Sequence, residues 1–590
     1  MTTRTTRRWF LVAVNACLAT ALLAFGGTVV ADTAPVADAG ASSHTAAPVA
    51  RPAPDRAAIA STHPLAAEAG MEILAKGGNA FDAAVAVAAA IGVADPKGAG
   101  LGGGGFFLLH QASDGRDVFV DAREVAPAAA TRDMFLDAAG NPVPDLSTRS
   151  AKAAGIPGIP AALDHLATSY GRLPLAASLE PAIRLARRGF RNSPAMALEN
   201  QLAYESEGSA GPVDSEFARV YLVDGKPPPA GYLIRQPDLA KSLEKLARSG
   251  AETFYRGSFQ YQLVMAVRGL GGLWSLDDLA NYLIVEREPI VATYRGLRIV
   301  SAPPPSSGGV WLACVLNTLS GYDRAKLDSA TWKHLILEAM RRAHRDRAQY
   351  LGDPAFTNVP VAMLTSPDYA AGLRASIRPD KVTPSDMLPG YAGDAVEQPH
   401  TTHFSILDAE GNRVAATITL NGWYGARLVI PGTGILLNNE MDDFAMKPGA
   451  PNMYGLVGAS ANAIAPGRRP LSSMSPTFVE SERGLLILGS PGGSYIPSMV
   501  LLGILARQQG ADAAAIAATP RFHHQYLPDA TFAEPAAFTA EERADLERRG
   551  HTFRPWPEDI GNLQVVTWDY ATGAVAAAAD PRRAGAGLVR

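Results

Sequence analysis

Residues 401–421 read Thr-Thr-His-Phe-Ser-Ile-Leu-Asp-Ala-Glu-Gly-Asn-Arg-Val-Ala-Ala-Thr-Ile-Thr-Leu-Asn. Alternating side chains on both sides of a turn at 409–412 predict a β-hairpin. A hydroxyl at the start of a hairpin becomes a nucleophile if the chain is cut just before it. The cut frees an α-amine with an ordinary pKa of about 7.7–8.0 beside that hydroxyl. Taken alone, the stretch fits a Thr-rich edge strand better, so the rest of the chain decides.

Further motifs carry the argument beyond the hairpin. They are Gly77-Gly78-Asn79 with Asp82-Ala83-Ala84, Leu101 to Phe106, Arg123-Glu124 with Ala126-Pro127, Pro303 to Gly309, Thr401-Thr402-His403, Thr417 to Asn421, Asn438 to Phe444, Pro470 to Thr477, Gly489 to Ser494, and Pro520 to Gln525. In this order they resemble the γ-glutamyltransferases, also called glutathione hydrolases, of the N-terminal-nucleophile hydrolase group. The resemblance runs from about Ala58 to the C-terminus, and its length excludes a chance match.

The coarse pattern of the chain indicates an α+β fold. Helices are expected at 65–76, from 79 to about 93, at 333–350 and at 497–508, with helical stretches dominating 157–375. Strands are expected at 106–109, 118–121 and 485–488. Two strand-rich blocks separated by a helical one suit a single α+β unit. The resemblance implies the four-layer αββα sandwich of N-terminal-nucleophile hydrolases.

The resemblance also implies self-cleavage between His400 and Thr401. The products would be a large chain, 58–400 with the segment before it, and a small catalytic chain, 401–590, held together as a heterodimer. Thr401 would be the nucleophile, and Thr419 would hydrogen-bond its hydroxyl. Gly492 and Gly493 would form an oxyanion hole, since glycine lets backbone N–H groups approach the reacting carbonyl. Gly102 to Gly105 is interpreted as structural.

A γ-glutamyl substrate carries a free carboxylate and a free ammonium, and both need partners. Arg123 is the expected carboxylate clamp, because guanidinium binds carboxylate through two hydrogen bonds. The remaining binding residues implied by the resemblance are Ser472 and Ser473 for the carboxylate, Asn421, Glu440 and Asp443 for the ammonium, and Tyr454 in a lid over 448–465. Without the resemblance, Arg123-Glu124 and Asp442-Asp443 would be interpreted as solvated surface charges. Gly422 to Ala426 departs from the family pattern, so the acceptor side is expected to be unusual.

Composition narrows the remaining functions. With 590 residues and a net charge of −4, nothing favours nucleic acid or an anionic membrane surface as a partner. Cys17 lies in the N-terminal apolar run, which is expected to be removed as part of a signal peptide. The mature chain would then keep only Cys314, expected to be a buried thiol, and no disulfide is expected. His523-His524 is a weak metal signal without a third ligand. Neither a cofactor nor a metal is expected, and the partners are small molecules: glutathione or another γ-glutamyl compound, and an amino acid or peptide acceptor.

The N-terminus indicates export. Arg4, Arg7 and Arg8 precede an apolar run from Trp9 to Phe25, which predicts a signal peptide over 1–31. The two adjacent arginines favour a twin-arginine signal over an ordinary secretory one, and the run is too short for a permanent membrane anchor. A disordered linker is expected over 32–57, and the protein should be periplasmic or secreted.

Two other functions stay open. One is an acylase on the same scaffold that removes glutaryl-type side chains, which differs in the ammonium pocket. The other is an inactive, unprocessed homologue that serves as a periplasmic binding protein.

Overall fold

The computed structural model describes residues 52–206, 214–388, 390, 401–557 and 560–590. The hairpin lies at its centre as β9 (Thr402–Leu407) and β10 (Arg413–Thr419), paired antiparallel. Its turn is held by the Asp408 carboxylate, which accepts the backbone N–H of Asn412 at 2.9 Å. Gly411 has φ +92°, a conformation that favours glycine. The expected hairpin is confirmed.

A seven-stranded antiparallel sheet is built around this hairpin in the order β20-β1-β9-β10-β2-β3-β6. Its other strands are β1 (Ala58–Ser61), β2 (Gly104–Gln111), β3 (Arg116–Ala122), β6 (Val285–Arg287) and β20 (Ala586–Val589). β2 and β3 confirm the expected strand pair. Because β1 lies between β9 and β20, segments from both sides of Thr401 interleave in one sheet. The folded part begins slightly before residue 58, since the backbone of Asp55 donates to Gly573 at 2.9 Å.

A second, six-stranded antiparallel sheet has the order β19-β18-β14-β13-β8-β7. Its strands are β7 (Ile290–Tyr294), β8 (Leu297–Ser301), β13 (Thr477–Ser481), β14 (Gly484–Gly489), β18 (Gln564–Asp569) and β19 (Val575–Ala579). The strand expected at 485–488 is confirmed. β7 and β8 were missed inside the block expected to be helical. A tight turn at Arg295-Gly296 joins the two strands, and both of its residues have positive φ. In the sequence, Gly296 was the available signal for this turn.

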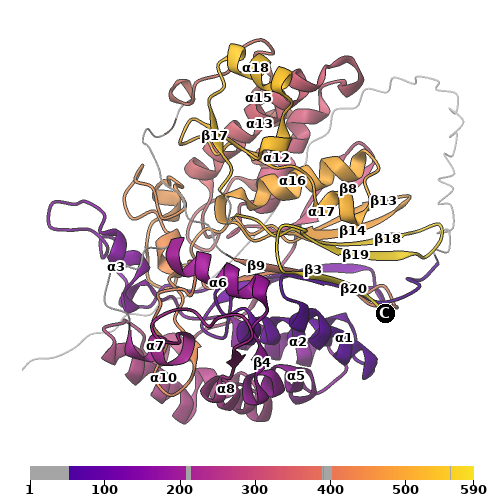
Figure 1. Ribbon diagram of the computed structural model, residues 1–590. Helices are drawn as coiled ribbons and strands as arrows, with labels where there is room; N and C mark the ends of the chain where they lie inside the picture. Colours follow the sequence, from indigo (N-terminus) through magenta and orange to yellow (C-terminus); the bar gives the residue numbers. More distant parts are fainter. Residues whose placement is uncertain (1–51, 207–213, 389, 391–400, 558–559) are drawn as a thin grey trace, which may run out of the picture. The chain divides into compact units, whose positions relative to one another are not determined.

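Helices cover the outer face of the first sheet (Figure 1). They include α1 (Pro64–Ala75), α2 (Ala80–Ala94), α4 (Ile159–Ser169), α5 (Leu175–Arg188) and α8 (Pro237–Ser249). Asn79 and Asp82 form a capping box that starts α2, which confirms the helix expected from residue 79 to about 93. Phe404 and Ile406 of β9 pack into this helix layer. The intervening residues of β9 therefore face the second sheet.

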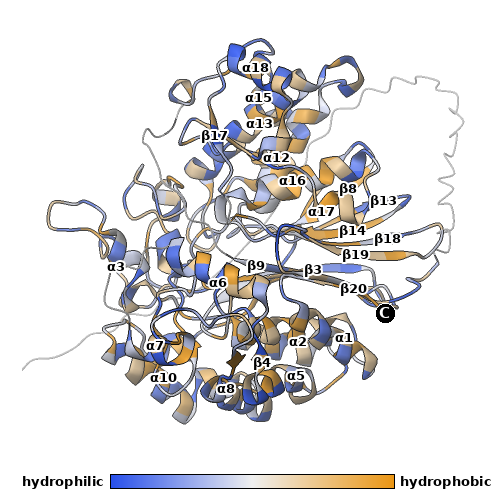
Figure 2. Cartoon of the chain, in the orientation of Figure 1, coloured by the Kyte–Doolittle hydropathy of each residue, from blue (hydrophilic) through white to orange (hydrophobic). Residues whose placement is uncertain are grey.

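Another helix layer covers the second sheet (Figure 1). It contains α12 (Gly308–Ser320), α13 (Ser329–Tyr350), α16 (Ile496–Gln508) and α17 (Ala513–Ala517). Figure 2 shows apolar residues gathered on α16, α17 and β14. The order helix, sheet, sheet, helix confirms the predicted αββα sandwich.

The remaining elements are short or peripheral. They are α3 (Pro144–Thr148), α6 (Pro194–Ser206), α7 (Ser215–Tyr221), α9 (Glu252–Tyr255), α10 (Gly257–Gly269), α11 (Leu276–Ala280), α14 (Val361–Leu364), α15 (Pro367–Ala375), α18 (Ala540–Arg549), β4 (Phe190–Arg191), β5 (Leu233–Ile234), β11 (Val429–Ile430), β12 (Ile435–Leu436), β15 (Phe522–His523), β16 (Thr531–Ala533) and β17 (Phe553–Pro555). Cys314 on α12 is buried, and burial raises the pKa of its thiol. No helix within the described ranges is long and apolar enough to cross a bilayer.

Candidate active site

Thr401 directly precedes β9, at the end of the first sheet where β2 also begins and β3 and β10 end. Ile418 of β10 pairs with Thr402 of β9, so one step further along the register sets Thr401 opposite Thr419. Opposed residues of antiparallel strands point to the same face. Here that face is turned toward the second sheet. Thr401 is 6% exposed, and the Thr419 hydroxyl accepts the backbone N–H of Asn421 at 2.8 Å.

One pocket brings together most of the residues predicted from the sequence. We call it the acyl pocket, and it is lined by Arg123, Thr401, Thr419, Asn421, Glu440, Asp443, Tyr454, Leu456, Ser472, Ser473, Met474, Gly493 and Ile496. Of the other predicted residues, Gly492 borders Thr401 from a second pocket. His400 lies outside the described residues. The residues that line the acyl pocket come from distant parts of the chain, and the predicted site requires them to lie together. The role of each residue stays a prediction.

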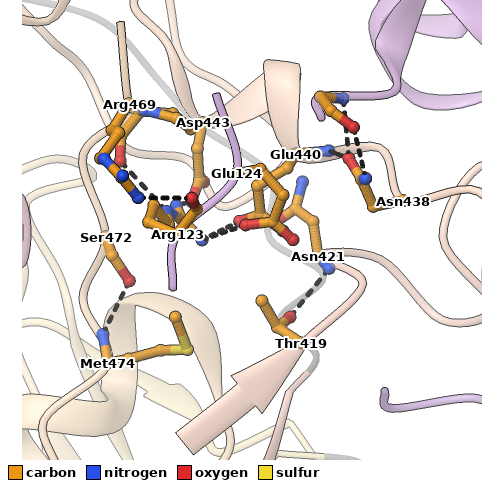
Figure 3. A network of polar contacts seen from close by, with 12 residues as sticks. Arg123, Glu124, Thr419, Asn421, Asn438, Glu440, Asp443, Arg469, Ser472 and Met474 are labelled. Atoms are coloured by element: carbon orange, nitrogen blue, oxygen red, sulfur yellow. Dashed lines mark hydrogen bonds and ion pairs between the residues drawn. The ribbon is translucent and has the colours of Figure 1, made fainter. Parts of the chain in front are cut away.

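Arg123 lines the acyl pocket and is buried, and Figure 3 shows it beside Asp443 and Glu440. It directly follows β3 and forms ion pairs with Glu440 and Asp443. Its Nη1 also lies 3.8 Å from Oε2 of Glu124. Burial lowers the pKa of Arg123, but the three carboxylates outweigh burial and leave the pKa raised. The guanidinium is therefore charged and held in place by carboxylates.

Three carboxylates form an acidic cluster around the Arg123 guanidinium: Glu124, Glu440 and Asp443. Burial raises the pKa of Glu124 to about 7 and raises that of Glu440 well above its ordinary value. Asn438 fixes Glu440, because its Oδ1 accepts the Glu440 backbone N–H at 3.0 Å. An ammonium group bound here would add a second positive charge beside the three carboxylates and favour their ionised forms.

The two predicted serines come from a loop braced by the Pro-rich motif. The backbone of Ser472 accepts from Ser307 and donates to Pro305, each at 2.8 Å. Its hydroxyl accepts the backbone N–H of Met474 at 3.1 Å. The Ser473 hydroxyl, like Oε2 of Glu440, is buried without a hydrogen-bond partner among the described residues. Buried polar atoms normally have partners, so these two atoms indicate a ligand site.

Asn421 and Tyr454 close one side of the acyl pocket. Asn421 has φ +73°, an uncommon conformation that clusters at functional sites. The Tyr454 hydroxyl donates to the backbone oxygen of Asn421 at 3.0 Å and also to its side-chain oxygen. Tyr454 is itself held by Gln525, whose amide donates to the Tyr454 carbonyl at 3.3 Å. The predicted lid residue therefore contacts the predicted ammonium site directly.

Glycine is required for different structural reasons at 492–493 and at 103. Gly492 has φ +134° and Gly493 has φ +50°, and they connect β14 to α16. A Cβ on Gly492 would lie 2.7 Å from Cε of Met499. A Cβ on Gly103 would lie 1.9 Å from the backbone oxygen of Thr419. The backbone approaches closely at Gly103, which agrees with the structural interpretation of the motif at 102–105.

Sequence reasoning missed part of the site. Glu124 had no assigned role, although it belongs to the Arg123-Glu124 motif. The second pocket contains Lys97 and Arg583, for which no motif gave a signal. His523 and His524 are buried, and no group of three metal-ligating side chains occurs in the portion of the chain that the structure describes.

The fold and site define a class of enzyme. An αββα sandwich whose central hairpin begins at a buried hydroxyl residue is that of an N-terminal-nucleophile hydrolase. The profile of the family described as Gamma-glutamyltranspeptidase matches residues 66–589. The chain belongs to this gamma-glutamyltranspeptidase family.

Individual relatives include both hydrolases and acylases. The chain is 42% identical over 529 residues to the glutathione hydrolase proenzyme of Escherichia coli (strain K12), covering 89% of this chain and 90% of that protein. It is 39% identical over 459 residues to the Acylase ACY 1 proenzyme of Pseudomonas sp. (strain SE83), covering 76% and 79%. A solved cephalosporin acylase from Bacillus halodurans is similar with a TM-score of 0.79 and 27% identity, over 94% of this chain and 99% of that one.

Proposed function

We propose that this protein is an exported γ-glutamyltransferase and glutathione hydrolase, activated by self-cleavage before Thr401. The observation that carries the proposal is the acyl pocket, where a hydroxyl at the start of β9 shares one cavity with Arg123 and carboxylates. A γ-glutamyl group has a reacting amide carbonyl at one end and a zwitterion at the other. The pocket has a partner for each part.

In the precursor, the Thr401 hydroxyl would attack the carbonyl carbon of His400. The C–O bond forms and the C–N bond breaks, and the proton of the hydroxyl passes to the nitrogen, which becomes the free amine of Thr401. Water then hydrolyses the ester, which releases the carboxylate of His400 and regenerates the hydroxyl. The resulting amine is the general base for later turnovers.

In the mature enzyme, the same hydroxyl would attack the γ-glutamyl amide. Thr419 lies opposite in the register and would orient the hydroxyl. Backbone N–H groups of Gly492 and Gly493 would stabilise the oxyanion. The amine leaves with one proton, and the γ-glutamyl ester of Thr401 passes to water or to an acceptor amine.

Substrate binding would exchange partners within the acidic cluster. The substrate carboxylate would bind the guanidinium of Arg123 and accept hydrogen bonds from the hydroxyls of Ser472 and Ser473. The substrate ammonium would form ion pairs with Glu440 and Asp443, and these two carboxylates would lose part of their contact with Arg123. Asn421 would supply a further oxygen under the lid that carries Tyr454. No metal or cofactor takes part in this scheme.

The two fragments would stay together after cleavage. β9 of the small fragment pairs with β1 of the large one, so the cut leaves the sheet intact. The signal peptide at 1–31 and the periplasmic or secreted location remain proposals from the sequence, and residues 1–51 lie outside the described part.

The test of the proposal is turnover of γ-glutamyl-p-nitroanilide and glutathione by the purified wild type and by Thr401→Ala. The wild type should hydrolyse both substrates and the variant neither. Preferential cleavage of glutaryl amides would replace the proposal with the acylase function. A single uncleaved chain without turnover would support the binding homologue.

A further inference from the structure

The lid expected over 448–465 is attached to a segment that follows β15, residues 524–527, which we call the anchor segment. Gln525 of this segment is only 3% exposed, and its side-chain amide donates to the Tyr454 carbonyl at 3.3 Å. Val457 of the lid belongs to the same buried apolar cluster as Tyr526 and Leu527. The anchor segment therefore holds the lid by a hydrogen bond and by an apolar contact three residues further along.

The hydrogen bond from Gln525 fixes a longer chain of donors and acceptors. A backbone carbonyl can only accept, so the amide nitrogen of Gln525 faces Tyr454 and its Oε1 faces Nε2 of His523 at 3.0 Å. An amide oxygen also only accepts, so Nε2 of His523 carries the proton. Nδ1 of the same ring is then an acceptor, and the Ser498 hydroxyl donates to it at 2.7 Å. The chain runs without interruption from Ser498 on α16 to Tyr454 in the lid.

The middle of this chain lies against the glycines proposed for the oxyanion hole. Tyr495 follows Gly493 by two residues, and its ring centroid lies 4.1 Å from that of His523. α16 begins with Ile496, which lines the acyl pocket together with Gly493 and Tyr454. Burial lowers the pKa of His523 to about 3, so the ring stays neutral. The imidazole thus connects the glycine segment with the lid on the other wall of the acyl pocket.

The His523-His524 pair, a weak metal signal in the sequence, is used to shape the anchor segment. Nδ1 of His524 accepts the backbone N–H of Tyr526 at 3.2 Å, and Nε2 lies 3.2 Å from Oδ1 of Asp529. One histidine therefore orients the amide of Gln525, and the other holds the backbone that carries it.

We propose that Gln525 is a positioning residue for donor binding, which holds Tyr454 where its hydroxyl reaches Asn421 in the acyl pocket. This inference rests on the proposed function and adds to it a residue that does not itself line the pocket. A binding group keeps its geometry when neighbouring hydrogen bonds and packing lock it in place. Loss of the contact from Gln525 should loosen the lid and weaken donor binding, with the chemistry at Thr401 unchanged once the donor is bound.

The first experiment measures kcat and KM for γ-glutamyl-p-nitroanilide in Gln525→Met, Tyr454→Phe and the double variant. Gln525→Met should raise KM about two- to tenfold, the loss expected for one neutral hydrogen bond, with kcat changed less than about twofold and self-cleavage retained. Because both substitutions act through the Tyr454 hydroxyl, the double variant should exceed Tyr454→Phe in KM by no more than about twofold.

The matched control is Gln236→Met. Gln236 is also 3% exposed and its amide also donates to a backbone carbonyl, that of Val93, but it lies directly before α8. This variant should keep the wild-type KM. A second variant, Gln525→Glu, keeps an oxygen for His523 and replaces the N–H that faces Tyr454, and it should also raise KM at pH 8.

A second experiment follows the lid without using catalysis. Chymotrypsin cuts after accessible tyrosines, and Tyr454 is only 3% exposed. Cleavage after Tyr454, which gives a fragment beginning with Gly455, should be about two- to tenfold faster in Gln525→Met than in the wild type. Gln236→Met should be cut at the wild-type rate.

An unchanged KM in both Gln525 variants would overturn the inference. Effects on KM that multiply in the double variant, or an equal rise of KM in Gln236→Met, would overturn it as well, because Gln525 would then act on general stability and not through Tyr454. Absence of donor turnover by the wild type would instead refute the proposed function. The chymotrypsin rates would still decide whether Gln525 holds the lid, so the two failures are distinguishable.

Discussion

A substrate without the ammonium tests whether the carboxylates of the acyl pocket need a positive charge from the substrate. A glutaryl amide is a γ-glutamyl amide without that ammonium. Its carboxylate would compete for Arg123 with Glu440 and Asp443, and no cation would replace the guanidinium that they share. Two unit charges 4 Å apart at an effective dielectric of 20 interact by about 4 kcal/mol. Protonation of Glu440, whose pKa burial raises, recovers part of this energy.

We therefore expect γ-glutamyl-p-nitroanilide to exceed glutaryl-p-nitroanilide by at least about a hundredfold in kcat/KM at pH 8, which corresponds to about 2.7 kcal/mol. Asp443→Asn should narrow the gap by removing one carboxylate. The gap should also narrow as the pH falls from 8 to 6. Carboxyls with raised pKa values, Glu124 at about 7 among them, take up protons in that window and lose their negative charge.

The assay is the release of p-nitroaniline from both substrates by the wild type and by Asp443→Asn across this pH range. Equal kcat/KM values in the wild type would refute the ammonium site and favour an acylase. A gap that widens toward pH 6 would refute the charge argument even if the preference itself were correct.

Three further predictions use single substitutions. Arg123→Lys keeps the charge that Glu440 and Asp443 require but loses the two-pronged guanidinium, so kcat/KM should fall about ten- to a hundredfold with self-cleavage retained; unchanged kinetics would show that another group binds the carboxylate. Tyr454→Phe removes the hydroxyl bonded to Asn421 and should lower donor kcat/KM about two- to tenfold, mostly through KM, and a loss confined to kcat would contradict the lid role. Gly103→Ala should lower stability by about 1–3 kcal/mol or more, because its Cβ would meet the Thr419 carbonyl; Gly100→Ala, with no heavy atom within 4 Å, is the matched control, and equal melting temperatures would contradict the packing argument.

The sequence predicted the hairpin and the first helices well because their signals are local. The turn at 409–412 and the Asn79 cap each depend on a few neighbouring residues. β7 and β8 were missed because each has only five residues and the short run of strands β6 to β8 lies between the helices α11 and α12. The acyl-pocket residues were predicted from the resemblance, since no spacing rule connects Arg123 with Glu440.

Other features of the site depend on packing across the chain. The pKa of Glu124 is raised because the side chain is buried beside other carboxylates, and burial of one residue is not visible in its local sequence. Likewise, Lys97 and Arg583 line one pocket only because the C-terminal segment returns to the nucleophile. Gly103 shows the intermediate case, where a motif was visible but its contact with Thr419 was not.

The central claim is that Thr401 becomes an N-terminal nucleophile by the action of its own hydroxyl. The direct measurement is intact mass and N-terminal sequencing of the purified wild type and Thr401→Ala. The wild type should give a fragment that matches residues 401–590 and begins with Thr401, and the variant should remain one chain. A wild-type fragment that begins elsewhere, or full cleavage of Thr401→Ala at the same bond, would contradict the account.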